Sequence, residues 1–299
     1  MTTIMKVLSL FDGISCGMVA LERAGIQVNK YVAYEIEQNA IEVSKTNYPQ
    51  IEHKGDVFKA NYNEGEFDLL IGGSPCTYWS IAKGSDGRET TSSGFGWELF
   101  MQYVRALKEA KPKYFLYENN ESMSDDIKEE ITKQLGVKPI MIDSADFSAQ
   151  TRKRYYWTNI PVDFNWIPSS LVFKDIEYEH DYRIISFEKY KNTLRVNQEN
   201  NCWAWDTSGK GYYSQQSRAR SKDFKMNTVP ASGSDKNNIY LGDYTYRKIH
   251  PIEAERLQTL PDNYTSCIKS KTKRIGLCGN GWTVDVIAHI LKGLTVQNY

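Results

Sequence analysis

Apolar and polar positions follow two distinct patterns along the first half of the chain. Short apolar runs such as KVLSLF (6–11) and FDLLIGG (67–73) have the length and composition of buried strands. Longer segments with apolar residues at helical spacing come between them, as shown by Leu99, Tyr103 and Leu107 after the second of these runs. Strands that alternate with helices predict an α/β fold with a doubly wound, mostly parallel sheet.

The same alternation continues beyond the first helical segments. KYFLYEN (113–119) predicts another strand. A helix is expected from about Ser124, whose side chain can cap it, to Gly136, which can end it. KPIMIDS (138–144) and RYYWTNI (154–160) then predict two further strands.

Beyond Pro161 the regular pattern is lost. Residues 200–238 are polar and aromatic with no clear period, which predicts a loop-rich module. Helical spacing returns in HPIEAERLQTL (250–260) and in TVDVIAHILKGL (283–294), although TVDV can also begin a strand.

These patterns predict two domains. Residues 1–162 and 263–299 would form the α/β domain, and residues 163–262 a smaller domain inserted into it. No stretch approaches the roughly 20 apolar residues that cross a bilayer, and the first residues lack the features of a signal peptide. A cytoplasmic protein is therefore expected.

The cysteines and histidines exclude two classes of small stabilised domain. The five cysteines are an odd number with no C-x-x-C pair, and the four histidines are scattered. This argues against a disulfide framework and against a zinc site, so no metal is expected.

The net charge is zero, but it is unevenly distributed. It is −4 over residues 1–162, −3 over 163–180, +4 over 181–236 and +3 over 237–299. A basic second half is compatible with a polyanion bound across one face.

Residues just after each predicted strand indicate a cofactor, because ligands of an open parallel sheet bind beyond the carboxyl ends of its strands. The first strand ends in FDGISCG, whose Gly13 and Gly17 let the backbone approach a ligand closely. Glu35 ends the second strand, where a carboxylate can accept hydrogen bonds from ribose hydroxyls, and Asp56 after the third can accept from an adenine amino group. These features predict a nucleoside-containing cofactor. Since G-x-G-x-x-G is absent, they favour a phosphate-free adenosyl cofactor over NAD.

Four more residues are expected at the same edge of the sheet. Cys76 follows the fourth strand, Glu118 follows the fifth, and Arg152 and Arg154 lie near the start of a later strand. A thiol, a carboxylic acid and two cations suit the addition of a thiolate to an electron-poor ring, with the acid protonating a ring nitrogen. The alternatives are a buried structural cysteine, a surface glutamate and solvated arginines.

Taken in order, these segments resemble the DNA (cytosine-5)-methyltransferase family. The matching stretches are LSLFDGISCG (motif I), YEIEQNA (II), GDV (III), GGSPCTYWS (IV), YENN (VI), QTRKR (VIII), HPIEAERLQTLP (IX) and GNGWTVDVIAHI (X). The match spans nearly the whole chain apart from residues 163–245. Motifs I, VIII and X are most similar to the catalytic domain of the animal de novo methyltransferases. Because no room remains for their chromatin-reading domains, the resemblance implies a stand-alone microbial or phage enzyme.

The resemblance implies methyl transfer from S-adenosylmethionine to C5 of cytosine in a specific double-stranded DNA sequence. Cys76 would attack C6 of a flipped cytosine and Glu118 would be the acid at N3, with Arg152 and Arg154 as pocket cations and Arg154 contacting the ring O2. The S-adenosylmethionine pocket would be formed by Phe11, Asp12, Gly13, Ile14, Gly17, Glu35, Ile36, Asp56, Val57, Pro75, Asn280 and Trp282. The DNA contacts would be Ser80, Gln150, Arg218, Arg220, Lys222 and Lys225.

The same resemblance makes residues 163–262 the target-recognition domain and the remainder the catalytic, cofactor-binding domain. A loop over residues 78–96 would close behind the flipped base, with hinges at Gly84, Gly87, Gly94 and Gly96. The family leaves open a cognate restriction endonuclease that forms no stable complex with the enzyme. Neither a metal nor a membrane is implied.

Two alternative functions and one difference from the family motifs have to be weighed beside the resemblance. A tRNA cytosine methyltransferase would use the same chemistry, but such relatives carry Cys-Phe-Thr in the recognition region, whereas Trp-Ala follows Cys202 here. A catalytically silent DNA-binding relative usually lacks Pro-Cys or Glu-Asn, and both pairs are present. The departure is Asn120, where the family usually has Val; it leaves Glu118 and Asn119 intact.

Overall fold

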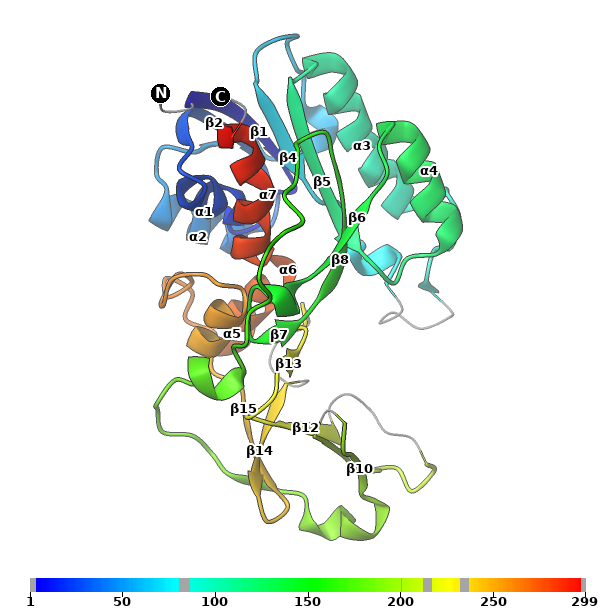
Figure 1. The fold of residues 1–299 in the computed structure, drawn as a ribbon, viewed down its shortest axis with the longest axis vertical. Coiled ribbons are helices and arrows are strands. Elements are labelled where there is room, and N and C mark those ends of the chain that lie inside the picture. The colour runs from blue at the N-terminus through cyan, green and yellow to red at the C-terminus, as the bar shows by residue number, and fades with distance from the viewer. Residues whose placement is uncertain (1–3, 81–86, 200, 212–216, 232–236, 297–299) are drawn as a thin grey trace. The chain divides into compact units, whose positions relative to one another are not determined.

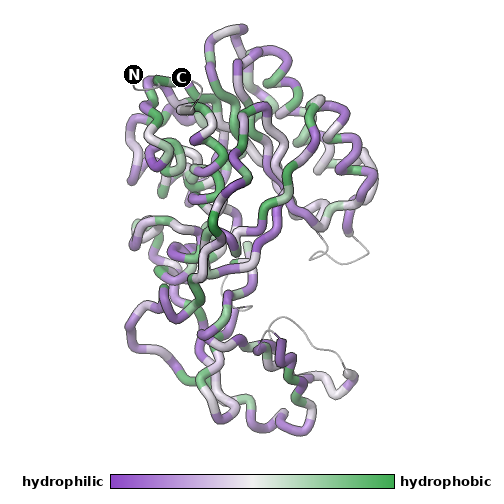
Figure 2. Tube along the Cα trace, viewed as in Figure 1, coloured by the Kyte–Doolittle hydropathy of each residue, from purple (hydrophilic) through white to green (hydrophobic). Residues whose placement is uncertain are grey.

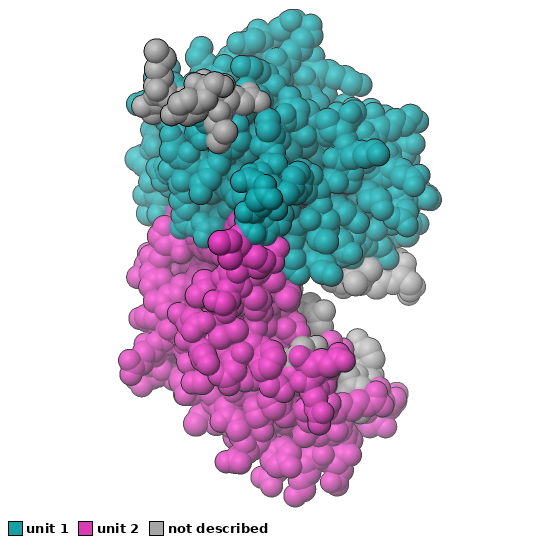
Figure 3. Space-filling model, viewed as in Figure 1, with its two compact units in different colours: residues 1–143, 153–166, 284–299 teal, residues 144–152, 167–283 magenta. Residues whose placement is uncertain are grey.

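Two compact units make up the chain in the computed structural model, which describes residues 4–80, 87–199, 201–211, 217–231 and 237–296. The first unit comprises residues 1–143, 153–166 and 284–299 (Figure 3). The second unit comprises residues 144–152 and 167–283. Residues 144–152 and 263–283, which the sequence assigns to the catalytic domain, therefore cluster with the second unit.

A single sheet forms the centre of the first unit (Figure 1). In the described residues its strands are β1 (Ile4–Leu10), β2 (Gln27–Tyr34), β3 (Glu52–His53), β4 (Leu69–Gly72), β5 (Tyr114–Asn120), β6 (Ile140–Asp143) and β8 (Lys153–Thr158). Their spatial order is β3-β2-β1-β4-β5-β8-β6, and β8 alone runs antiparallel to its neighbours. The predicted α/β fold with a mostly parallel sheet is thus confirmed.

Helices cover both faces of this sheet (Figure 1). On one face lie α1 (Cys16–Arg23), α2 (Gln38–Asn47) and α7 (Val284–Val296), and on the other lie α3 (Phe95–Ala110) and α4 (Asp125–Leu135). The core between the sheet and the second pair is apolar and aromatic, with Leu8, Leu70, Phe100, Tyr117 and Trp157 wholly buried. Figure 2 shows the corresponding hydrophobic stretches along the central strands.

Local signals set the helix ends as predicted for α4. The Ser124 side chain accepts a hydrogen bond from the Ile127 N–H at 3.4 Å, and Gly136 ends the helix with a φ of +71°. The ambiguity at TVDV is resolved in favour of a helix, since α7 begins at Val284.

The second unit contains more regular structure than the sequence indicates. Its described strands are β7 (Gln150–Thr151), β9 (Ile185–Ser186), β10 (Arg195–Asn197), β11 (Cys202–Ala204), β12 (Arg218–Ser221), β13 (Met226–Asn227), β14 (Asn238–Gly242) and β15 (Thr245–Lys248). One sheet has the order β10-β11-β12-β14-β15-β9, and β13 pairs with β7. These strands have two to five residues each, too few for a period of two to stand out.

The small core of this sheet is aromatic. The rings of Phe187 and Trp205 stack with centroids 4.1 Å apart, and Trp203 stacks on Tyr240 at 3.8 Å. Hydrophobic and hydrophilic residues are mixed along this part of the chain (Figure 2).

A buried ion pair fixes the start of α5 (Pro251–Leu257), which is followed in this unit by α6 (Lys271–Asn280). Arg247 and Glu253 are both wholly buried and make two parallel hydrogen bonds of 2.9 and 2.7 Å. The guanidinium also contacts Glu177 at 2.9 Å. Removing one member of such a pair would leave an uncompensated buried charge, so the three groups act as a unit.

Within the described residues, no helix has both the length and the apolar character needed to cross a membrane.

His250 also caps α5, and its environment disfavours the charged form. Its Nδ1 accepts a hydrogen bond from the Ile252 N–H at 3.3 Å. Burial, followed by nearby positive charge, lowers the pKa of His250 from 6.5 to about 4. The charged or titratable neighbours are His180, Lys271, Arg274 and Arg247.

We expect His250→Asn to make the stability of the fold less dependent on pH. The unfolded chain takes up a proton at His250 below pH 6.5, whereas the folded chain does so only near pH 4. Stability is therefore highest above pH 6.5 and is lost as the pH falls towards 4, by up to about 2 kcal/mol at pH 5. Asn keeps a capping oxygen without a titrating group. Urea denaturation at pH 7 and pH 5 should show a smaller loss for the variant, and an equal loss would contradict the assignment.

Candidate active site

The Pro-Cys turn follows β4 and leaves Cys76 only partly buried. Gly72 ends the strand, and a Cβ there would lie 2.7 Å from the Leu10 carbonyl oxygen of neighbouring β1, so the close approach requires glycine. Pro75 is exposed and Cys76 is only partly buried, at the start of a 3₁₀ turn. A buried structural cysteine would look different, as Cys16 does in α1.

Glu118 and Arg154 form an ion pair beside this turn. They lie on the antiparallel neighbours β5 and β8, and Arg154 Nε is 2.9 Å from Glu118 Oε1. Glu118 is 8% exposed, so solvent screens the pair only weakly. Arg154 Nη1 also donates to the Lys153 carbonyl oxygen at 2.7 Å. The cation orients the carboxylate and balances its charge.

Hydrogen bonds tie the end of β5 to the Pro-Cys turn from behind. Asn119 Nδ2 donates to the Ser74 carbonyl oxygen at 3.1 Å and to the Tyr117 hydroxyl oxygen at 3.0 Å. The Tyr117 and Ser74 hydroxyls are 2.7 Å apart. Burial raises the pKa of Tyr117, so its hydroxyl keeps its proton.

Adjacent parallel strands bring these groups to one edge of the sheet. Gly72, the last residue of β4, pairs with Tyr117 of β5, so the turn with Cys76 begins beside the carboxyl-terminal part of β5, where Glu118 lies. Three of the four predicted catalytic residues thus lie in the first unit, Glu118 on β5, Arg154 on β8 and Cys76 in the turn after β4.

A second group of predicted residues lies at the ends of β1 and β2. Phe11, Gly13 and Ser15 all have positive φ angles, 57°, 59° and 59°, so the loop after β1 turns sharply. The Gly13 N–H donates to Glu35 Oε2 at 2.8 Å. Glu35 Oε1 accepts from the backbone N–H groups of Ile36 and the next residue, both at 2.8 Å. The carboxylate therefore bridges the loops after two strands.

Asp12 faces the protein interior. Its Oδ1 accepts hydrogen bonds from Ser9 at 2.6 Å and Tyr31 at 2.7 Å, and its Oδ2 accepts from Ser15. Burial raises the pKa of Asp12, although these hydrogen bonds oppose the rise. The contacts support a role in holding the loop rather than in touching a ligand.

The remaining first-unit candidates for the cofactor pocket differ in exposure. Ile36 is 68% exposed, which is unusual for a large apolar side chain. Asp56 accepts a hydrogen bond from the Phe58 N–H at 3.0 Å and is partly buried. Three other candidates are buried residues, namely Ile14, Gly17 and Val57.

Three of the predicted catalytic and cofactor-binding residues belong to the second unit. Arg152 is 5% exposed and its Nη2 donates to the carbonyl oxygens of Gly279 at 3.2 Å and Gly281 at 3.0 Å. Asn280 is exposed and Trp282 is partly buried. The Arg152 contacts hold the turn on which Asn280 lies, which supports a positioning role for this arginine.

Several of the predicted DNA contacts make internal hydrogen bonds. Gln150 is wholly buried, and its side-chain amide nitrogen Nε2 donates to the Leu257 carbonyl oxygen at 2.6 Å. Lys225 Nζ donates to three backbone carbonyl oxygens at 2.8 to 3.0 Å, which uses all three of its N–H groups. Arg220 Nη1 donates to the backbone carbonyl oxygen of Lys225 at 2.7 Å. The side chains of Arg218 and Lys222 are exposed, and Lys222 Nζ donates to Glu177 Oε2 at 3.3 Å.

Ser80 and the loop that follows it are described only in part. The Ser80 N–H donates to the Cys76 carbonyl oxygen at 3.0 Å. Of the predicted hinges, Gly84 lies outside the described residues. Gly94 has a φ of +85°, and the Gly96 N–H donates to Glu89 at 3.1 Å, so both glycines are packed at the start of α3.

Comparison with known proteins decides the family. The sequence model of the C-5 cytosine-specific DNA methylases matches residues 5–295. The chain belongs to this family. It is therefore a DNA methyltransferase that acts at C5 of cytosine, and the family and fold imply S-adenosylmethionine as the methyl donor.

Several relatives resemble this methylase over their full length. It is 28% identical to the type II methyltransferase M.FnuDI of Fusobacterium nucleatum, over 96% of this chain and 93% of the relative. It is 26% identical to the type II methyltransferase M.NgoPII of Neisseria gonorrhoeae, over 96% and 94%.

Solved structures share the fold. The methyltransferase EhMeth of Entamoeba histolytica has a TM-score of 0.72 at 15% identity, with 100% of this chain and 99% of that chain covered. The Dnmt2 methyltransferase of S. pombe has a TM-score of 0.69 at 15% identity, with 99% and 100% covered. At this identity the likeness concerns the fold alone.

Sequence reasoning missed Ser74 and Tyr117, the two hydroxyls behind the methylase's Pro-Cys turn. A signal was present, because side chains alternate along a strand and Tyr117 must share a face with Asn119. What the sequence does not show is that this face meets the loop after β4.

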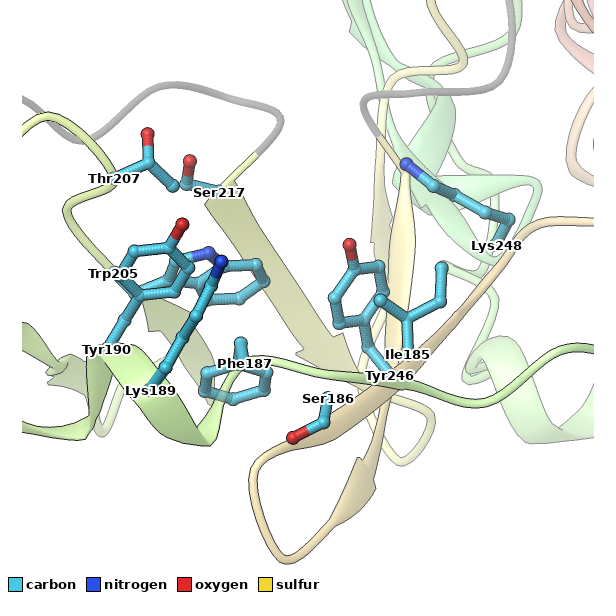
Figure 4. Close-up of a pocket in the computed structure, with 10 residues that line it drawn as sticks. All are labelled: Ile185, Ser186, Phe187, Lys189, Tyr190, Trp205, Thr207, Ser217, Tyr246 and Lys248. Atoms are coloured by element: carbon cyan, nitrogen blue, oxygen red, sulfur yellow. The ribbon is translucent and has the colours of Figure 1, made fainter.

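The second unit also has a hollow that contains none of the predicted residues. It has a volume of about 460 Å³ and is lined by Ile185, Ser186, Phe187, Lys189, Tyr190, Trp205, Thr207, Ser217, Tyr246 and Lys248 (Figure 4). Phe187 and Trp205 at its base are buried and stacked on each other. Among the described residues, no group of histidine, cysteine or carboxylate side chains could hold a metal ion.

We expect Tyr117→Phe to lower the free energy of unfolding by about 1 to 2 kcal/mol, because it leaves buried groups of Ser74 and Asn119 short of a partner. Tyr62→Phe is the matched control, since the Tyr62 hydroxyl is buried without a partner in the described part of the chain. That change should be neutral or slightly stabilising. Urea denaturation of both variants measures the difference, and equal effects would refute the role given to the Tyr117 hydroxyl.

Proposed function

We propose that this enzyme methylates cytosine within a specific double-stranded DNA sequence through a covalent bond between Cys76 and C6 of a flipped base. The observation that carries the proposal is the accessible Cys76 turn next to the buried Glu118–Arg154 pair. A cytosine in a duplex cannot reach a thiol at the edge of a sheet, so it must leave the stack, at roughly a few kcal/mol.

The first step joins the thiol to the ring. Cys76 Sγ, as thiolate, bonds to C6 while the C5–C6 double bond shifts to C4–C5 and the electrons of C4–N3 take a proton at N3 from Glu118. Arg154 holds the Glu118 side chain in place and can turn its remaining N–H groups towards the ring O2. Carbon C5 is thereby made nucleophilic.

The second step releases the product. S-adenosylmethionine, when bound, supplies an electrophilic methyl group on a sulfonium sulfur. Once C5 carries the methyl group, Glu118 takes back the N3 proton, water takes the proton from C5, the C5–C6 double bond re-forms and Cys76 leaves as thiolate. No atom of the enzyme is consumed.

The residues at the ends of β1 and β2 fit the adenosyl part of the donor. Three backbone N–H groups occupy the Glu35 carboxylate, which has about four acceptor positions and so retains room for a ribose hydroxyl. Ile36 offers an exposed apolar face for a purine ring. A Cβ at Gly13 would meet no atom within 4 Å, which leaves open space above the loop. We assign Phe11 to the same group of cofactor contacts, and Asn280 and Trp282 of the second unit stay predicted cofactor contacts.

Target recognition is assigned to residues 163–262, and catalysis to residues 1–162 with 263–299. Arg218 and Lys222 are the two predicted contacts whose side chains are exposed. A cognate restriction endonuclease would cut the same sequence when it is unmethylated, without binding the methylase. Such a system acts in the cytoplasm of a bacterial or phage-infected cell.

The covalent step is tested with DNA that contains 5-fluorocytosine at a confirmed target. Fluorine replaces the hydrogen that must leave C5, so we expect the enzyme to stay joined to the duplex in the presence of S-adenosylmethionine. Cys76→Ala should abolish the adduct on a denaturing gel, whereas Cys267→Ala, at another partly buried cysteine, should not. An undiminished adduct in Cys76→Ala would overturn the mechanism, and modification of tRNA but not duplex DNA would overturn the substrate.

Recognition is tested by replacing Arg218 and Lys222 together with alanine. We expect altered target preference, by roughly 1 to 3 kcal/mol for a base contact, or a smaller salt dependence for phosphate contacts. Lys111→Ala with Lys133→Ala removes the same charge from exposed sites of the first unit and serves as control. Filter binding at several salt concentrations measures both effects. If the two double variants behave alike, the recognition surface lies elsewhere.

A further inference from the structure

Asn120, at a position where the family usually has valine, has a buried acceptor that no described residue satisfies. The side chain is 3% exposed, and its Oδ1 has no hydrogen-bond partner in the part of the chain that the structure describes. Its Nδ2 donates to Ser122 Oγ at 3.3 Å, which orients the amide. A buried acceptor without a partner costs about 1 to 3 kcal/mol, so a valine would be the more stable choice unless the oxygen has a use.

The strand places this oxygen with the catalytic groups. Side chains alternate along β5, so Asn120 shares a face with Glu118, while Tyr117 and Asn119 lie on the other face and bind Ser74. In the pairing of β5 with β8, Asn120 is opposite Arg154, the ion-pair partner of Glu118. Asn120 is thus the next residue along the face that carries the Glu118–Arg154 pair.

The chemistry of the base identifies the missing donor. On a cytosine attached to DNA, the N–H donor of the Watson–Crick edge is the exocyclic amino group on C4, next to N3. The proposed function places N3 at Glu118, one position away from Asn120 on the same strand face. The amino group has two N–H bonds, so it can serve an acceptor beside Glu118.

We propose that Asn120 Oδ1 accepts a hydrogen bond from the C4 amino group of the flipped cytosine, an inference that rests on the proposed function. This makes Asn120 a specificity-determining residue. Uracil and thymine carry an oxygen on C4, which would face Oδ1 as a second acceptor and be repelled. A site built to hydrogen-bond a substrate N–H also rejects analogues that lack it.

The test compares two trapped bases that differ in the amino group. One duplex carries 5-fluorocytosine at the target, and the other carries 5-fluoro-2-pyrimidinone, which has hydrogen on C4. We expect Asn120→Val to slow covalent adduct formation on 5-fluorocytosine about tenfold and to leave the rate on 5-fluoro-2-pyrimidinone within about twofold, because only the first base loses a partner. Single-turnover rates from denaturing gels give both values, and each enzyme is its own control for folding and cofactor binding.

The outcomes separate the inference from the function beneath it. If the wild type traps both duplexes and Asn120→Val slows both equally, or neither, the hydrogen bond to the amino group is refuted while the proposed function stands. If the wild type traps neither, the proposed function fails and the inference fails with it. Asn120→Ala provides the same comparison should the valine variant not fold, since either change removes Oδ1.

Discussion

The hydrogen bond from Asn119 Nδ2 to the Ser74 carbonyl oxygen is the contact on which the catalytic arrangement depends. It joins the end of β5 to the loop after β4, and so fixes the Cys76 turn relative to Glu118. Each such bond contributes only about 1 kcal/mol to stability. Its importance is geometric, because a displacement of about 1 Å between nucleophile and acid can change a rate by about a hundredfold. The hydroxyls of Tyr117 and Ser74 restrict the same contact from the side.

Strand β5 serves this arrangement with both of its faces. Tyr117 and Asn119 use one face to hold the neighbouring loop, and Glu118 on the other face pairs with Arg154. Such a division is possible only in an interior strand with neighbours on both sides, here β4 and β8. The parallel neighbour leads into the Cys76 turn and the antiparallel neighbour carries Arg154, so one antiparallel strand in the sheet is what brings this cation beside Glu118.

The fold of the first unit could be predicted because its strands and helices are long enough to show their periods. The ends of α4 followed from Ser124 and Gly136, and the placement of Cys76 followed from its position after a strand, whereas Glu118 lies within β5 rather than after it. The second unit could not be predicted in the same way. Strands such as β9, with two residues, are held by contacts distant in sequence rather than by local preference.

The identity of a polar residue did not reveal its partner either. Lys225 occurs in a basic segment, as a DNA contact would, yet its ammonium binds three backbone carbonyl oxygens. Gln150 is buried against Leu257 and Gln258. A side-chain donor that is hydrogen-bonded within the protein and one that is free to bind DNA look the same in the sequence. Both are cations or amides among polar neighbours.

These buried donors explain how a unit with a small apolar core can keep a defined geometry. The aromatic cluster around Phe187 and Trp205 lies in the six-stranded sheet, whereas the α5–α6 region is held by polar groups such as the Arg247–Glu253 pair. Buried ion pairs add little net stability compared with apolar residues of the same size. They restrict the number of acceptable arrangements, however, because every alternative packing leaves a charge or an amide without a partner. In this unit, therefore, polar contacts specify where the exposed Arg218 and Lys222 lie, and stability and the proposed recognition of DNA can change separately.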